Sequence, residues 1–314
     1  MPVVAVAGGT SSIGRSIVEA IVETGKHEVI VLSRKPNPEL EDVLKVRFIA
    51  VDYFDHEGLV ECLEDNKIHT LISAMTFKPT NGAIPEVQLL TAADASKVTR
   101  RYVFNNWGCP LEDGDELRMP VQAFKVEALK ALHQTKDLEH TQFYPGFFTD
   151  YWCMPAVKSH IEAAAYVVDI PNSTAVIPGD GTTPVGFTHT LDVAKYVAAA
   201  LDLEKWESEY NIVADKKTWN EFLPLFEDAR GTKFKVTYDS IESLKAGNPT
   251  PLPAQAEAGL FAEGSPFPQL MCFALVLLVN GKFDVKRGRA AKEAFPDIHA
   301  RTVKELMDLA WKKT

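Results

Sequence analysis

The chain has 314 residues, of which 46% are hydrophobic and 24% charged, and its formal net charge is −10. This composition is typical of a globular protein, and the length allows two domains. The negative charge argues against general binding to nucleic acids or to anionic membranes, because both require a cationic surface. The four cysteines show no metal-binding spacing, so we expect neither a metal site nor a disulfide framework.

The first half of the sequence alternates apolar strands with amphipathic helices. Strands are predicted at Val3–Ala7, Glu28–Ser33, Arg47–Val51, His69–Ser73, Arg101–Phe104 and Thr141–Tyr144. Helices are predicted from Ser12 to Gly25, and over His56–Asn66, Glu86–Lys97 and Pro120–His133. Apolar strands joined by helices indicate a parallel sheet that is covered on both faces. With right-handed crossovers, this becomes a Rossmann-type, doubly wound α/β fold.

The pattern changes after about residue 150, where turn clusters separate single strands and helices. We therefore expect a Rossmann domain over residues 1–150 and a smaller C-terminal substrate lobe over residues 151–314, interleaved with the last elements of the sheet. The apolar run Leu270–Val279 is shorter than the roughly 20 residues of a membrane span and predicts a buried helix or pocket wall. Gly247–Pro268, rich in Pro, Gly and Ala, predicts a mobile loop. No signal peptide is visible, so a cytoplasmic location is expected.

The turn between the first strand and the first helix is rich in glycine and hydroxyl residues. Glycines at this position let the backbone approach a pyrophosphate, while the helix presents free N–H groups to the same place. Ser11 stands where a middle glycine is usual, and its hydroxyl can donate to phosphate oxygens. The turn predicts a dinucleotide site, although a tight turn without ligand has the same pattern. The candidate binding residues are Gly8, Thr10, Ser11, Ser12, Ile13 and Gly14.

The end of the second strand predicts which dinucleotide is bound. An NAD site places a carboxylate about 20 residues after the last glycine, to hold the ribose 2′-OH. Twenty residues after Gly14 the chain has Arg34, flanked by Ser33 and Lys35. Cations at this position can pair with a 2′-phosphate, which a carboxylate would repel. The sequence therefore predicts NADP(H) as the cofactor.

Two further strand ends belong to the predicted cofactor site. Asp52, just past the third strand, is a candidate partner for the adenine amino group, although a helix cap fits nearly as well. Ser73, Ala74 and Met75 end the fourth strand, and ligands of such sheets lie at the carboxyl ends of the strands. We expect these three residues beneath the nicotinamide half.

Four stretches together resemble one family. They are VAVAGGTSSIG near the start, VLSRK after the second strand, RRYVFNNWG at 100–108 and FYPGFFTDY at 143–151. In this order they are similar to the NmrA-like, or isoflavone-reductase-like, branch of the atypical short-chain dehydrogenases/reductases. The resemblance implies an NADP-dependent oxidoreductase of secondary metabolism. None of the eight tyrosines is followed four positions later by lysine, so the Tyr-x-x-x-Lys pair of the typical enzymes is absent.

The resemblance also implies candidate catalytic residues. A lysine on the helix after the fifth strand, here Lys125, would contact the nicotinamide ribose and assist proton transfer; a surface lysine is the alternative. Asn106 lies in a turn where the family has a Pro-Ser-Glu-Phe-Gly-like sequence, and its amide could orient a carbonyl oxygen. Tyr144 could supply a hydroxyl. The catalytic candidates are thus Lys125, Tyr144 and Asn106.

Aromatic residues after the sixth strand predict a wall for a flat, apolar ligand, although ordinary core aromatics would give the same pattern. Lys125, Tyr144, Gly146 and Phe147 are added to the cofactor contacts. The candidate substrate residues are Trp107, Phe148, Tyr151, His189 and Met271, of which His189 could instead be a buried loop histidine.

The predicted function is an NADPH-dependent reductase that acts on a C=O, C=N or conjugated C=C bond of an aromatic, polyketide or alkaloid-like small molecule. The first alternative is an NADP(H)-sensing regulatory protein without turnover. A redox-neutral isomerase or dehydratase on the same fold is the second. A monomer or homodimer is expected.

Overall fold

The computed structural model describes residues 1–75, 85–111 and 120–312. The chain divides into two compact units, each built from more than one segment. The first unit contains Met1–Tyr144, Thr190–Asn211 and Arg287–Ile298. The second contains Pro145–His189, Ile212–Lys286 and His299–Thr314.

The described part of the first unit is built on a sheet of eight parallel strands. The strand order is β14-β11-β6-β5-β4-β1-β2-β3. The strands are β1 (Val3–Ala7), β2 (Glu28–Ser33), β3 (Arg47–Ala50), β4 (Ile68–Ser73), β5 (Arg101–Val103), β6 (Glu139–Tyr144), β11 (Glu209–Asn211) and β14 (Arg289–Ala290). The chain runs outward from β1 to β3, returns to β4 and continues in the other direction, so the order reverses between β1 and β4. The predicted doubly wound α/β fold is confirmed.

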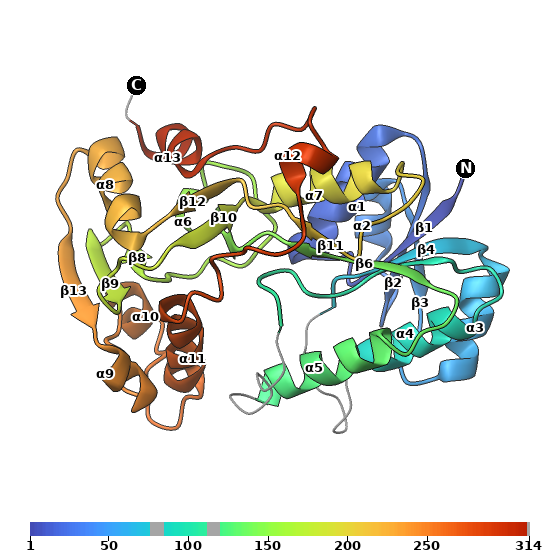
Figure 1. Ribbon diagram of the computed structural model, residues 1–314, viewed down its shortest axis with the longest axis horizontal. Helices are drawn as coiled ribbons and strands as arrows, with labels where there is room; N and C mark the ends of the chain where they lie inside the picture. The colour runs from blue at the N-terminus through green and yellow to red at the C-terminus, as the bar shows by residue number, and fades with distance from the viewer. Residues whose placement is uncertain (76–84, 112–119, 313–314) are drawn as a thin grey trace. The chain divides into compact units, whose positions relative to one another are not determined.

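Helices cover both faces of this sheet (Figure 1). They are α1 (Ser12–Thr24), α2 (Pro38–Leu44), α3 (His56–Asp65), α4 (Pro85–Ala95), α5 (Pro120–Leu132), α7 (Thr190–Ala200) and α12 (Ala291–Ala294). Helix α1 packs on α7, while α3, α4 and α5 pack side by side on the opposite face. Alternate residues of the central strands, such as Ile30 and Leu32, are fully buried against Leu59, Leu89 and their neighbours on these helices. Burial of this apolar surface fixes the sheet and so positions the ends of its strands.

The described part of the second unit holds two three-stranded sheets. One contains β7 (Phe147–Phe148), β10 (Val185–Thr188) and β12 (Asp215–Lys217), and the other β8 (Val168–Asp169), β9 (Thr174–Pro178) and β13 (Lys235–Asp239). Its helices are α6 (Asp150–Cys153), α8 (Trp219–Arg230), α9 (Ile241–Lys245), α10 (Pro253–Glu257), α11 (Phe267–Val279) and α13 (Val303–Trp311). Trp152, Phe187, Trp219 and Phe222 form an aromatic core, with ring centroids 4.6–5.9 Å apart.

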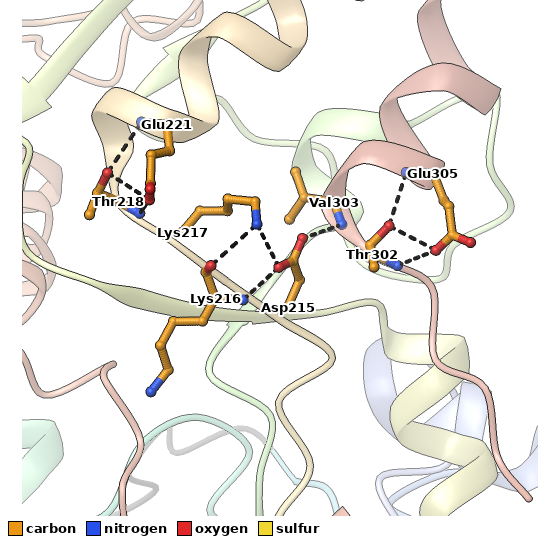
Figure 2. Close-up of polar contacts among 8 residues, drawn as sticks. All are labelled: Asp215, Lys216, Lys217, Thr218, Glu221, Thr302, Val303 and Glu305. Carbon is orange, nitrogen blue, oxygen red and sulfur yellow. Dashed lines mark hydrogen bonds and ion pairs between the residues drawn. The ribbon is translucent and has the colours of Figure 1, made fainter. Parts of the chain in front are cut away.

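Two helices of the second unit begin with the same local sequence signal (Figure 2). Thr218 caps α8 and Thr302 caps α13, and in each case a glutamate three residues later bonds back to the cap. Such a cap contributes about 1 kcal/mol to stability. Asp215 joins the two starts: it accepts the Val303 N–H at 3.1 Å and pairs with Lys217 Nζ at 2.9 Å.

The apolar run at 270–279 lies in α11, where five side chains are buried. None of the helices in the described part of the chain is both long and apolar enough to cross a membrane. The prediction of a mobile loop over Gly247–Pro268 is wrong where α10 forms. Gln255 of α10 is 3% exposed, donates to the Ala165 carbonyl at 2.8 Å and accepts the Leu252 N–H at 2.9 Å, so side-chain bonds order this segment.

Candidate functional site

A cavity of about 780 Å³ lies in the first unit at the carboxyl ends of β1 to β4. Its wall includes the turn after β1, the ends of β2, β3 and β4, and the first residue of α4. This is the place where the strand order reverses, and ligands of open parallel sheets bind there. The volume is within the range of about 300 to 1,000 Å³ that is typical of cofactor and small-molecule sites.

The turn after β1 leaves no room for side chains at two glycines. Gly8 has a φ of +83°, and a Cβ there would lie 2.6 Å from the carbonyl oxygen of Ala74. A Cβ on Gly14 would clash with the carbonyl oxygen of Gly8. The turn can therefore pack against the end of β4 and against the start of α1 only because both positions lack a side chain.

Of the six residues predicted in this turn as cofactor contacts, three lie in the wall of the cavity. Gly8, Thr10 and Ser11 lie in the cavity wall. Ser11 is the N-cap of α1, and its exposed side chain makes no capping bond. Ser12 is the first helical residue, with a φ of +53°. Ile13 is 5% exposed, so its side chain is not available to a ligand.

The turn after β2 carries the predicted cations. Arg34 is exposed and lies in the cavity wall, and the neighbouring Lys35 is exposed too. The Ser33 hydroxyl donates a hydrogen bond to the Lys35 carbonyl at 2.7 Å. This bond shapes the turn, but it also means that the hydroxyl proton is already used and is not free to donate to a ligand. Tyr53 donates to the Leu32 carbonyl at 2.8 Å. Burial raises the pKa of Tyr53, and the positive charge of Arg34 partly opposes this shift.

The structure distinguishes the two interpretations of Asp52. Asp55 is the N-cap of α3 and accepts the Gly58 N–H at 3.0 Å. Asp52 therefore does not cap the helix. It is exposed in the cavity wall, where one carboxylate oxygen accepts the Phe54 N–H at 2.9 Å.

The end of β4 is held by buried hydrogen bonds. Ala74 and Met75 lie in the cavity wall, whereas Ser73 is fully buried and turns its hydroxyl to Glu86, at 2.5 Å. Two side chains after β5 bind the same segment: Asn105 Nδ2 donates to the Met75 carbonyl at 2.6 Å, and Trp107 Nε1 to the Ser73 carbonyl at 3.0 Å.

Sequence reasoning missed Glu86, the second residue of α4. Its side chain is 2% exposed, and its carboxylate also accepts the Tyr102 hydroxyl at 2.9 Å. Burial raises the pKa of Glu86 above its usual value, although the hydrogen bonds from Ser73, Tyr102 and Asn105 oppose the shift. A glutamate in the first turn of a helix is ordinary in sequence, so only its burial marks it out.

The catalytic candidates differ in their surroundings. Lys125 on α5 is half-buried, and loss of hydration lowers the pKa of its ammonium group, against the charges of Cys109 and Glu86. Tyr144 is 1% exposed and donates its hydroxyl to Glu209 at 2.8 Å; burial and this bond raise its pKa. Asn106 is 2% exposed and donates to Gln142 at 3.3 Å. Of the three, Lys125 is the one whose surroundings move its pKa toward neutral pH.

The substrate candidates are divided between the two units. Trp107 lies in the first unit, stacked on Phe143 with ring centroids 6.1 Å apart. The other candidates, Phe148, Tyr151, His189 and Met271, lie in the second unit, together with the proposed cofactor contacts Gly146 and Phe147. These assignments stay predictions.

Two of the substrate candidates are part of the second unit's interior. Met271 is 4% exposed, and His189 has no exposed surface. The His189 ring lies 3.5 Å from the Asp150 carboxylate and 3.4 Å from the Arg301 guanidinium. Phe148 and Tyr151 are half-buried, and Tyr151 packs edge-to-face on Tyr166 at 4.7 Å.

Over the ranges 1–75, 85–111 and 120–312, no group of three or more His, Cys, Asp or Glu residues is arranged to hold a metal ion. A doubly wound sheet with a glycine-rich first turn and a cavity at the reversal of strand order is the arrangement of the Rossmann-type α/β proteins. More narrowly, the chain belongs to the NmrA-like family, whose model matches residues 2–276. The family expected from the sequence motifs is therefore confirmed.

Named relatives and solved structures agree with this assignment. Oxidoreductase BOA1 of Botryotinia fuckeliana is 38% identical over 74% of this chain and 77% of its own length. Oxidoreductase swnN of Metarhizium robertsii is 28% identical, over 99% of this chain and 98% of its own. The leucoanthocyanidin reductase–NADPH complex from Vitis vinifera superposes with a TM-score of 0.74 at 15% identity, covering 98% of both chains. The predicted class, an oxidoreductase, is the class that these relatives carry in their names.

Proposed function

We propose that the protein is an NADPH-dependent reductase of a small aromatic, polyketide-like or alkaloid-like metabolite. The observation that carries the proposal is the cavity at the ends of β1 to β4, in which a glycine turn and the exposed Arg34 share one wall. The turn suits a pyrophosphate, and the guanidinium suits a 2′-phosphate. The NADPH complex of the leucoanthocyanidin reductase, a protein of the same fold, supports this choice of cofactor.

The residues of the cavity fit NADPH in strand order. Asp52 and Arg34, at the ends of β3 and β2, would hold the adenine and the 2′-phosphate. The Gly8–Gly14 turn would hold the pyrophosphate, and Ala74 and Met75 at the end of β4 would support the nicotinamide half. When bound, NADPH supplies the hydride, and the protein supplies position and charge.

Lys125 is our proposed proton donor. A catalytic acid works best when its pKa is near the working pH, and loss of hydration lowers the pKa of Lys125 in that direction. Tyr144 is less suited, because its hydroxyl already donates a hydrogen bond to Glu209 and its pKa is raised. Asn106 would orient rather than transfer a proton, because an amide does not titrate.

We assign substrate recognition to aromatic side chains of the second unit. Tyr151 and Tyr166 are half-buried and contact each other edge-to-face, with ring centroids 4.7 Å apart. Partly exposed rings in this arrangement favour flat, apolar ligands. This supports an aromatic or polyketide-like substrate and leaves the reduced bond open.

A second candidate function is an NADP(H)-binding regulator without turnover. It is favoured by the hydrogen bonds that engage Tyr144 and Asn106, because groups bound to Glu209 and Gln142 are not poised for a substrate.

A turnover assay separates the two functions. NADPH consumption is followed at 340 nm with a panel of aromatic ketones, enones and imines, for the wild type and for Lys125→Met. A reductase consumes NADPH with at least one of them, and Lys125→Met, measured at saturating NADPH, lowers kcat by about 100-fold or more. Calorimetry that shows tight NADPH binding, with no consumption across the panel, would favour the regulator.

A further inference from the structure

Glu86 is a buried carboxyl group for which the proposed reaction has no role. It follows Pro85, which lies in the cavity wall, and it is 2% exposed. Ser73 donates to one of its oxygens at 2.5 Å and Tyr102 to the other at 2.9 Å. The backbone N–H of Asn105 also points to the second oxygen, at 3.4 Å. Burying a carboxyl group is costly unless several donors meet it, so a group placed in this way has a structural or functional reason.

The donors of Glu86 come from three places that meet at one end of the cavity. Ser73 ends β4, Tyr102 lies in β5, and Asn105 follows β5. The turn after β5 also bonds directly to β4, because Asn105 Nδ2 donates to the Met75 carbonyl and Trp107 Nε1 to the Ser73 carbonyl. Glu86 therefore links the start of α4 to the ends of β4 and β5.

This linked segment is the wall against which the glycine turn packs. A Cβ on Gly8 would lie 2.6 Å from the Ala74 carbonyl oxygen, so the two backbones already touch. A shift of Ser73 away from Glu86 would carry Ala74 and Met75 with it and change the cavity at the β4 side. The β2 and β3 sides, with Arg34 and Asp52, are separated from that shift by β1.

We propose that Glu86 is a positioning residue for the nicotinamide half of the cofactor, acting through Ser73 and the turn after β5. This inference rests on the proposed NADPH site. A carboxylate suits the task better than an amide, because each of its two oxygens accepts hydrogen bonds, whereas the amide of glutamine offers one accepting oxygen. The negative charge of an ionised Glu86 also raises the pKa of Lys125, the proposed proton donor.

The test compares two ligands that share the adenine, ribose and 2′-phosphate but differ in the nicotinamide half. Calorimetry with NADPH and with adenosine 2′,5′-bisphosphate is performed on the wild type, Glu86→Ala and Glu86→Gln. Glu57→Ala is the matched control, because Glu57 is an exposed glutamate in the first turn of α3. Thermal melting of each variant reports whether it folds.

Glu86→Ala should weaken NADPH binding at least tenfold and leave adenosine 2′,5′-bisphosphate within twofold of the wild type. Glu86→Gln, which can keep one acceptor, should recover part of the loss and lie three- to fivefold below the wild type for NADPH alone. It carries the test if Glu86→Ala does not fold. Glu57→Ala should match the wild type with both ligands.

Two results would overturn the inference: unchanged affinity for both ligands in the Glu86 variants, or an equal loss for both, which is what general damage to the unit would give. A wild-type protein that binds neither ligand contradicts the NADPH site itself. The failure of the inference is therefore distinguishable from the failure of the proposed function.

Discussion

The two sides of the cavity in the first unit are built in different ways. On the β2 and β3 side, Arg34 and Asp52 are exposed side chains that follow directly on strand ends. On the β4 side, Ser73, Glu86 and Asn105 are buried and hydrogen-bonded across three elements. The first side presents groups to a ligand, whereas the second fixes backbone. Ligand selectivity should therefore depend on the first side and cavity shape on the second.

The largest expected effect lies between the two sides, at the glycine turn. Gly14→Ala should weaken NADPH binding about 100-fold or more, because the added Cβ clashes with the Gly8 carbonyl and must displace the turn. Gly25→Ala is the matched control at the other end of α1: Gly25 has a φ of +64° and no atom within 4 Å of an added Cβ. It should cost about 1 kcal/mol of unfolding free energy and leave the Kd of NADPH unchanged. Calorimetry and urea unfolding measure both; equal Kd values for the two variants would contradict the role of the turn.

On the β2 and β3 side, Arg34→Ala should reduce NADPH affinity by about tenfold or more and leave NADH affinity unchanged, because a charge-assisted bond contributes about 1.5–3 kcal/mol. Arg47→Ala is the control. Arg47 is also exposed, but it lies at the amino end of β3, away from the cavity, where it donates to Asn66 at 2.6 Å. The preference for NADPH should survive in Arg47→Ala, and its survival in Arg34→Ala would place the 2′-phosphate elsewhere.

Two neighbouring aspartates separate an effect on NADPH affinity from an effect on the unfolding free energy. Asp52→Ala should weaken NADPH binding about threefold, the size of one exposed hydrogen bond, with little change in stability. Asp55→Ala removes the cap of α3 and should cost about 1 kcal/mol of unfolding free energy with no change in NADPH affinity. The opposite pattern would mean that Asp52 has no contact with the cofactor.

The smallest effect concerns the pH dependence of the buried side. Burial raises the pKa of Glu86 in the folded chain, so between its unfolded and folded pKa values the folded state holds more protons. Its contribution to the unfolding free energy therefore falls as pH rises through that range. Glu86→Gln removes this dependence, and its stability relative to the wild type should increase from about pH 4.5 upward. Urea unfolding at several pH values tests the sign; a relative stability that falls with pH would contradict it. Glu57→Gln gives the reference for removing an exposed first-turn carboxylate.

The same comparison explains how far the sequence alone could predict the molecule. The alternation of apolar strands and helices predicted the parallel sheet, because burial on both faces leaves a direct pattern in the residues. The spacing of the glycine turn and Arg34 within one βαβ unit predicts a shared cofactor site, and both lie in the wall of one cavity; their contact with a cofactor stays a prediction. Asp52 could not be distinguished from a cap until Asp55 was seen to cap α3.

The role of Glu86 could not be predicted, because its hydrogen-bond partners Tyr102 and Ser73 lie 16 and 13 residues away in the chain. The sequence predicted that the last elements of the sheet come from the second half of the chain, but not which strands these are. The strands β11 and β14 join the sheet from residues 209–211 and 289–290, and neither has a local sign of its partner. In the second unit, the Thr-x-x-Glu boxes of α8 and α13 were present in the sequence as helix starts.

The most direct measurement is the calorimetric Kd of NADPH and of NADH for the wild-type protein under identical conditions. The account predicts that NADPH binds at least tenfold more tightly, because Arg34 stands where an NAD site has a carboxylate. Equal weak binding of both cofactors, or binding of neither, would contradict it.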